Sequence, residues 1–251
     1  MSPTPFVSIR KWIHWQGEEA GEDTDTLVLT SAAKYFIDIR IYLPKSPSNI
    51  TQSDPNLPPT RLEWAFAGTA YSTPAEHDSE TGQLKKPAHT QWTHWIDNKT
   101  TDEVMDEGDM FPKDDGSNEV LERGAMVNPN TGNMQKYEEC WADLDSVLLP
   151  GEDQFQSWVL VTKTATPDTV VRGMMIRIGG YVQAILRNNK EVGLKKWKWS
   201  EDEKIWRETA VMGNLGSPLG TKDLGKAMKL GDEFVAHDGL MWRCVEAYAW
   251  K

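Results

Sequence analysis

A tryptophan–histidine cassette that occurs twice holds the residues of this chain best suited to chemistry. Residues 12–15 and 92–95 both read W-x-H-W, in stretches rich in strand-forming residues. Side chains of an extended strand alternate between its two faces, so the first tryptophan of each cassette shares a face with the histidine and the second tryptophan lies opposite. In a cavity, an indole beside an imidazole suits a flat apolar ligand with one polar group. In a packed core, the same pair is a large apolar residue beside a hydrogen-bonded histidine.

Other aromatic and ionisable residues lie in or next to the same strand-like stretches. A histidine beside an indole in a dry pocket can act as an acid or base near neutral pH, or polarise a carbonyl or phenol. The spacing does not distinguish these roles from structural hydrogen bonds, so no catalytic residue is assigned. The candidate ligand-binding residues are Arg10, Trp12, His14, Trp64, Phe66, Trp92, His94 and Trp95.

Alternation with period two dominates the elements that must position these residues. Isoleucines at 37, 39 and 41 alternate with Phe36, Asp38 and Arg40, and similar patterns recur at 62–66, 155–164, 174–178 and 240–249. Turn residues separate these stretches, and helical periodicity is confined to a short segment near 221–230. Many short strands with regular turns predict an all-β fold with little helix, either a sandwich or a barrel.

The acidic, proline- and glycine-containing segment at 149–153 marks a predicted domain boundary. Strand patterning stops before it and resumes directly after it, which divides the chain into residues 1–150 and 151–251. The proline-rich stretch 44–60 fits a surface loop within the first domain.

Composition and missing motifs exclude several classes of function. The formal net charge of −11 argues against nucleic-acid binding and against anionic membrane surfaces, and no apolar run is long enough to span a bilayer. The start of the sequence has no apolar signal region, and two distant cysteines form no disulfide framework, so we expect a cytoplasmic protein. Nucleotide-binding loops and metal-ligand spacings are absent from the sequence, which predicts no cofactor and no metal.

The order of several segments resembles the fungal Hri family, named in yeast for interaction with an Hrr-type casein kinase. The resemblance covers nearly the whole chain and implies two consecutive lipocalin-like antiparallel β-barrels, no established enzymatic activity and a casein-type kinase as a partner. The doubled W-x-H-W cassette is a departure from the yeast member of this family. The segments are 63–69 (EWAFAGT), 95–97 (WID), 106–112 (DEGDMFP), 137–141 (YEECW), 173–186 (GMMIRIGGYVQAIL) and 239–242 (GLMW).

The interpretation favoured by the sequence is a cofactor-independent barrel that binds a bulky hydrophobic or aromatic small molecule in a Trp/His-lined cavity. One alternative is a cofactor-free enzyme of fungal secondary metabolism, such as a cyclase, an isomerase or a pericyclase of the Diels–Alderase kind. Its tryptophans would hold the substrate, and His14, His94 or Arg10 would polarise it. Another alternative is a non-catalytic adaptor for the kinase, with filled barrels.

Overall fold

The protein is built almost entirely of β-strands, as a computed structural model shows for residues 4–44, 55–129, 131–165, 170–189, 191–213 and 217–251. This confirms the predicted all-β class. Two 3₁₀ turns, η2 (Pro59–Arg61) and η3 (Thr221–Asp223), are the helical segments of the described residues, and neither is long or apolar enough to cross a membrane. The strands are β1 (Phe6–Trp15), β2 (Thr24–Thr30), β3 (Tyr35–Tyr42), β4 (Leu62–Thr73), β5 (Glu76–His77), β6 (Leu84–Lys86), β7 (Ala88–Asp97), β8 (Val104–Pro112), β9 (Glu119–Val127), β10 (Met134–Leu144), β11 (Phe155–Ala165), β12 (Val170–Ile178), β13 (Tyr181–Asn188), β14 (Glu191–Ser200), β15 (Ile205–Met212), β16 (Glu233–Val235) and β17 (Met241–Trp250).

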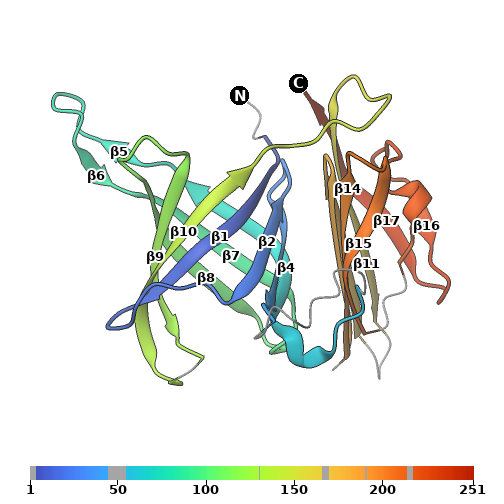
Figure 1. The fold of residues 1–251 in the computed structure, drawn as a ribbon, viewed down its shortest axis with the longest axis horizontal. Coiled ribbons are helices and arrows are strands. Elements are labelled where there is room, and N and C mark those ends of the chain that lie inside the picture. The colour runs from blue at the N-terminus through green and yellow to red at the C-terminus, as the bar shows by residue number, and fades with distance from the viewer. Residues whose placement is uncertain (1–3, 45–54, 130, 166–169, 190, 214–216) are drawn as a thin grey trace.

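The first half of the chain forms a closed antiparallel barrel, as predicted. Its strands follow the order β1-β10-β9-β8-β7-β4-β3-β2, while β5 and β6 form a separate hairpin that projects from the barrel (Figure 1). Closure leaves no free sheet edge and encloses an interior that a barrel of eight strands fills with side chains or with one small ligand.

The second half forms one seven-stranded antiparallel sheet in the order β15-β14-β13-β12-β11-β17-β16. Between described residues no ladder joins β15 to β16, so this unit is an open sheet, whereas the family resemblance implied a second barrel. The physical reason lies in the segment between β15 and β16. Its Leu219, Leu224 and Met228 pack with Trp158 and Trp242 in one hydrophobic cluster, so side chains cover the core where a ladder would have closed it.

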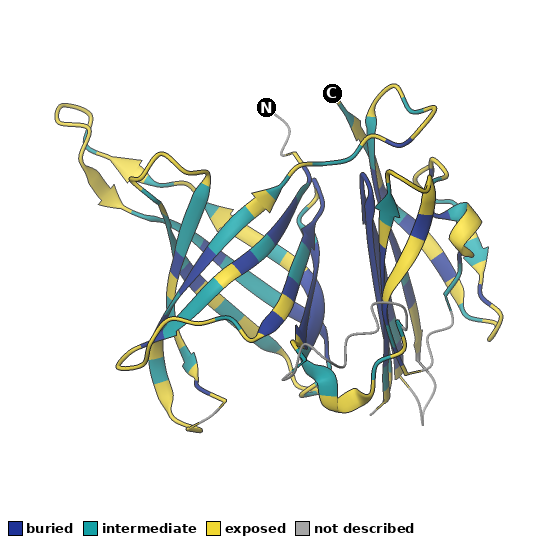
Figure 2. Ribbon diagram, in the orientation of Figure 1, coloured by how far each residue is buried: buried dark blue, intermediate teal, exposed yellow. Residues whose placement is uncertain are grey.

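The two units pack face to face through a second hydrophobic cluster, which we call the shared core. Its buried members come from both halves, among them Ile37 and Ile39 of the barrel and Met174 and Ile176 of the open sheet. Figure 2 shows the most buried strands on the two sides of this contact. The strand ladders separate on either side of residue 150, but the apolar packing does not. The division of the chain into two domains therefore stays a prediction.

Part of the proline-rich stretch joins the two units. The amide of Leu57 donates to the Val211 carbonyl (2.9 Å), and the Val211 amide donates to the Pro55 carbonyl (2.7 Å), so this segment runs along the free edge of β15. Residues 45–54, the centre of the predicted loop, lie outside the described residues.

Candidate ligand-binding site

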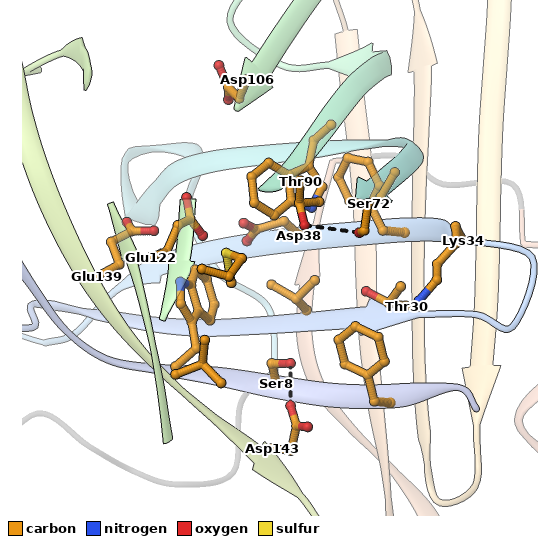
Figure 3. A pocket seen from close by; sticks show the side chains of 18 of the residues that line it. Ser8, Thr30, Lys34, Asp38, Ser72, Thr90, Asp106, Glu122, Glu139 and Asp143 are labelled. Carbon is orange, nitrogen blue, oxygen red and sulfur yellow. Dashed lines mark hydrogen bonds between the residues drawn. The ribbon is translucent and has the colours of Figure 1, made fainter. Parts of the chain in front are cut away.

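The barrel interior contains a cavity of about 420 Å³ (Figure 3). Residues from the start of β1, the β2–β3 turn, the end of β4 and the start of β7 line its upper part: Phe6, Lys34, Ser72 and Ala88. In antiparallel strands these positions meet at one end of the barrel. We call this end of the cavity the mouth and the opposite end the floor.

Aromatic side chains form much of the cavity wall. Trp64 and Phe66 follow each other on the inner face of β4 with ring centroids 4.6 Å apart, and the Phe36 ring of β3 meets Phe66 edge-on at 5.8 Å. Trp92 of β7 and Trp141 of β10 also line the cavity. Rings held by their neighbours in this way present a rigid apolar surface, which is what a flat ligand packs against at low entropic cost.

Two buried guanidinium groups organise the floor. Arg10 of β1 bonds to Glu139 of β10 at 2.6 Å and to Glu22 at 2.7 Å. Arg40 of β3 bonds to Asp38 at 2.8 Å and lies 3.6 Å from Glu139. Glu139 therefore joins the two arginines, and these charges stay buried because each has a partner of opposite sign.

A hydrogen-bonded tyrosine–glutamate pair lies beside this network, and two glycines leave the space that its side chains occupy. The Tyr137 hydroxyl of β10 donates to the Glu122 carboxylate of β9 at 2.7 Å. A Cβ atom on Gly108 would lie 2.7 Å from Cγ of Glu122, and one on Gly124 would lie 2.6 Å from the Tyr137 hydroxyl oxygen. Burial raises the pKa of Glu122 to about 8, and the nearby Glu139 carboxylate acts in the same direction. Near neutral pH this carboxyl therefore holds a proton.

The histidine of the second cassette belongs to a buried polar cluster below the aromatic wall. The His94 ring donates from Nδ1 to Asp97 at 2.8 Å, and its Nε2 lies 3.3 Å from Asp106. The ring stacks on Phe66 at 4.2 Å, and the Trp64 indole also donates to Asp97. Burial lowers the pKa of His94, but its bonds to Asp106 and Asp97 outweigh this and raise the pKa above its ordinary value. The His94 side chain has no exposed surface and does not line the cavity.

The stability that His94 contributes is expected to depend on pH. A raised folded-state pKa means that this contribution is fully present below about pH 6.5, the ordinary imidazole value, and is lost as pH rises through the folded pKa. Urea unfolding of His94→Gln should therefore show a larger deficit at about pH 5.5 than at about pH 9, and His77→Gln, on the exposed β5 strand, is the control. A deficit that is constant across this range would contradict the ion-pair assignment.

Three of the eight predicted binding residues line the cavity, namely Trp64, Phe66 and Trp92. Arg10 lies in the floor network and His94 in the buried cluster beneath the wall.

The remaining three predicted residues belong to the cassettes and lie away from the cavity lining. A bulge after Arg10 shifts the register of β1, so Trp12 pairs with Cys140 and His14 with Glu138, while the cavity-lining positions of β10 are 137, 139, 141 and 143. Directly paired residues point to the same side of a sheet, so these two side chains lie on the outer face. Trp95 packs against the shared core.

Sequence reasoning missed the acidic and basic residues of the lumen. Asp38 and Arg40 stood on the polar face of a predicted strand, and this alternation was the available signal. Glu122, Tyr137 and Glu139 carried no comparable signal, because their partners come from distant parts of the chain.

Comparison with known proteins agrees with this architecture. A family model described as Protein HRI1 matches residues 6–246. The chain belongs to the HRI1 family. The fold of this HRI1 family member is also similar to the crystal structure of an uncharacterized protein from Saccharomyces cerevisiae, with a TM-score of 0.68 and 19% sequence identity over 98% of this chain and 100% of that one. At that identity the likeness shows the fold alone. Comparison with curated proteins gives no match.

Proposed function

We propose that this HRI1 family member is a cytoplasmic protein that binds a bulky hydrophobic or aromatic small molecule inside its closed barrel. The observation that carries the proposal is the cavity of about 420 Å³, which lies within the range of about 300–1,000 Å³ that small-molecule sites occupy. Its aromatic wall and polar floor match the usual division of such a site, in which apolar surface supplies affinity and a few polar groups orient the ligand.

The floor supports this proposal because its side chains are held in place by contacts with one another. The Arg40 guanidinium lies 5.3 Å from the Trp64 ring centre and 5.4 Å from that of Phe66, and it is also held by Asp38. A ligand would therefore meet side chains whose positions are already fixed, so little conformational entropy would be lost on binding.

A cofactor-free enzyme is the second candidate, and Glu122 is the observation that favours it. A carboxylic acid with a pKa of about 8 at a cavity is suited to general acid catalysis near neutral pH. His94 does not line this cavity, so it is not placed to contact a substrate bound there. The kinase association that the family resemblance implies stays a further prediction, on which these contacts do not bear.

Titration with the neutral fluorescent probe N-phenyl-1-naphthylamine tests the proposed cavity. We expect saturable enhancement of its emission. Trp92→Ala should lower the affinity for the probe by at least about tenfold, which corresponds to about 1.4 kcal/mol of binding free energy. Trp12→Ala is the matched control, because Trp12 lies on the same barrel but outside the cavity lining, and it should bind as wild type does. A linear response, or equal losses in both variants, would overturn the proposal.

A further inference from the structure

Carboxylates outnumber cations along the cavity lining. Among the described residues that line it, five are acidic and two are basic. Glu122 holds a proton near neutral pH, so four carboxylates face two cations. The acidic residues are Asp38, Asp106, Glu122, Glu139 and Asp143, and the basic ones are Lys34 and Arg40.

Cationic groups neutralise only part of this acidic set. Glu139 contacts both arginines of the floor, and Asp106 lies beside His94. In contrast, Glu122 accepts a hydrogen bond from the Tyr137 hydroxyl, and Asp143 accepts one from the Ser8 hydroxyl at 2.9 Å. Within the described part of the chain, neither of these two carboxylates has a cationic side chain within ion-pair distance.

A buried acceptor without a partner points independently to a missing donor. Oδ1 of Asp38 has no hydrogen-bond partner among the described residues, although Asp38 is only 3% exposed and lines the cavity. An unsatisfied buried oxygen of this kind is unfavourable, because it has lost its bonds to water without replacement. An N–H group of a ligand would supply the donor.

The distribution of positive charge disfavours a carboxylate ligand. Figure 3 shows Lys34 at the opposite end of the cavity from Glu122 and Glu139. Lys34 lies 5.3 Å from the Phe6 ring centre at the mouth, and burial lowers its pKa. The Nε1 donor of Trp141 has no hydrogen-bond partner within the described ranges, but it is a neutral group and does not offset a negative charge.

We propose that the barrel selects an amine, whose aromatic or apolar body packs on the tryptophan-rich wall and whose protonated nitrogen binds the carboxylates of Asp38 and Glu122. This inference rests on the proposed function, since it names the chemical class that the same cavity takes. A protonated amine supplies an N–H donor to Oδ1 of Asp38. Its charge also offsets the excess of carboxylates, which a neutral alcohol cannot do.

The state of Glu122 before binding agrees with this assignment. Its raised pKa leaves a proton on the carboxyl near neutral pH, and an incoming ammonium group displaces that proton. The side chains that influence the pKa of Glu122 are Tyr137 and Glu139 from β10 and Asp38 and Arg40 from β3.

Three ligands with the same indole ring test the inference: tryptamine, the alcohol tryptophol and indole-3-propionate. Each is titrated by calorimetry against the whole chain at about pH 7 and about 0.15 M salt, where long-range attraction to the acidic surface is screened. We expect tryptamine to bind at least about tenfold more tightly than tryptophol, with indole-3-propionate weakest. Trp92→Ala should weaken the binding of tryptamine. This result would show that the amine binds in the cavity and not on the surface.

Both Glu122→Gln and Asp38→Asn keep the side-chain shape. Asp38→Asn removes a charge, and Glu122→Gln removes the carboxyl group that ionises when the amine binds. Each should reduce the ratio of tryptamine to tryptophol affinity toward one while N-phenyl-1-naphthylamine still binds, and this probe also confirms that the variant is folded. Asp38→Asn leaves the buried Arg40 with one charged partner fewer. Should it not fold, Glu122→Gln decides the question, because a glutamine oxygen can still accept the Tyr137 hydrogen bond.

The possible failures are distinguishable. Equal affinity for tryptamine and tryptophol, or preference for indole-3-propionate, would overturn the amine assignment while probe binding upholds the cavity. Absence of probe binding to the wild-type chain would overturn the proposed function, and the amine assignment with it.

Discussion

Glu139→Gln is expected to lower the free energy of unfolding by about 3–5 kcal/mol, the usual result of removing one partner from a buried ion pair. The Glu139 side chain is 2% exposed and lies between Arg10 and Arg40, which are themselves buried. A neutral amide would leave two guanidinium groups close together with less negative charge to offset them. Their mutual repulsion and incomplete hydrogen bonding would then act against the folded barrel.

Urea unfolding measures this change, and the adjacent residue provides a matched control. Glu138 pairs with Arg123 at the barrel surface, where the arginine side chain is 51% exposed, so Glu138→Gln should cost less than about 1 kcal/mol. The two substitutions are chemically identical and differ by one position along β10. Equal losses would show that the floor network does not stabilise the barrel beyond an ordinary surface pair.

Alternation along the chain predicted the strands well, but it did not predict which face of a strand lines the cavity. In β3, the isoleucines at 37, 39 and 41 face the shared core outside the barrel, and Phe36, Asp38 and Arg40 face the lumen. An isolated barrel would place its apolar residues inside. The second sheet reverses this expectation, because it buries the outer surface of the barrel and leaves the interior free to be polar. The sequence of β3 alone does not show that a distant part of the chain covers its outer face.

Bulges limited the prediction of the cassettes in a different way. The two W-x-H-W motifs have the same spacing, but the bulge in β1 follows Arg10, before the motif, and the bulge in β7 falls within it, at Trp95. A bulge adds one residue to a strand, so the side chains after it point to the opposite face of the sheet. Equivalent residues of the two motifs therefore lie on different faces of the barrel. Trp92 therefore lines the cavity, whereas Trp12 lies outside it.

The ion-pair network of the floor could not be predicted from the sequence, because it depends on how the barrel closes. Arg10 and Glu139 are 129 residues apart, and they meet because β1 pairs with β10 to close the barrel. Charged residues at such separation look like ordinary surface charges until closure is known. By residue type, the sequence identified three aromatic residues of the wall, Trp64, Phe66 and Trp92, but which acidic groups line the cavity depends on the register of closure.

Ile176→Ala is expected to destabilise the whole chain, by about 2–5 kcal/mol, as for other buried isoleucines truncated to alanine. Ile176 of β12 is fully buried in the shared core, where it packs in the same cluster as Ile37 and Ile39 of the barrel. The cavity left by truncation would loosen β3, whose opposite face carries Asp38 and Arg40. We therefore expect one cooperative urea transition at a lower midpoint and weaker probe binding.

The same substitution at an exposed position of the second sheet is the control. Ile205 of β15 is 50% exposed, so Ile205→Ala should change the free energy of unfolding by no more than about 0.5 kcal/mol. The outcome also tests the predicted division into residues 1–150 and 151–251. If Ile176→Ala lowers only one of two resolved transitions and leaves probe binding unchanged, the barrel is stable without its neighbour. If both halves are lost together, the shared core makes them one folding unit, and the open sheet is part of what holds the ligand cavity in shape.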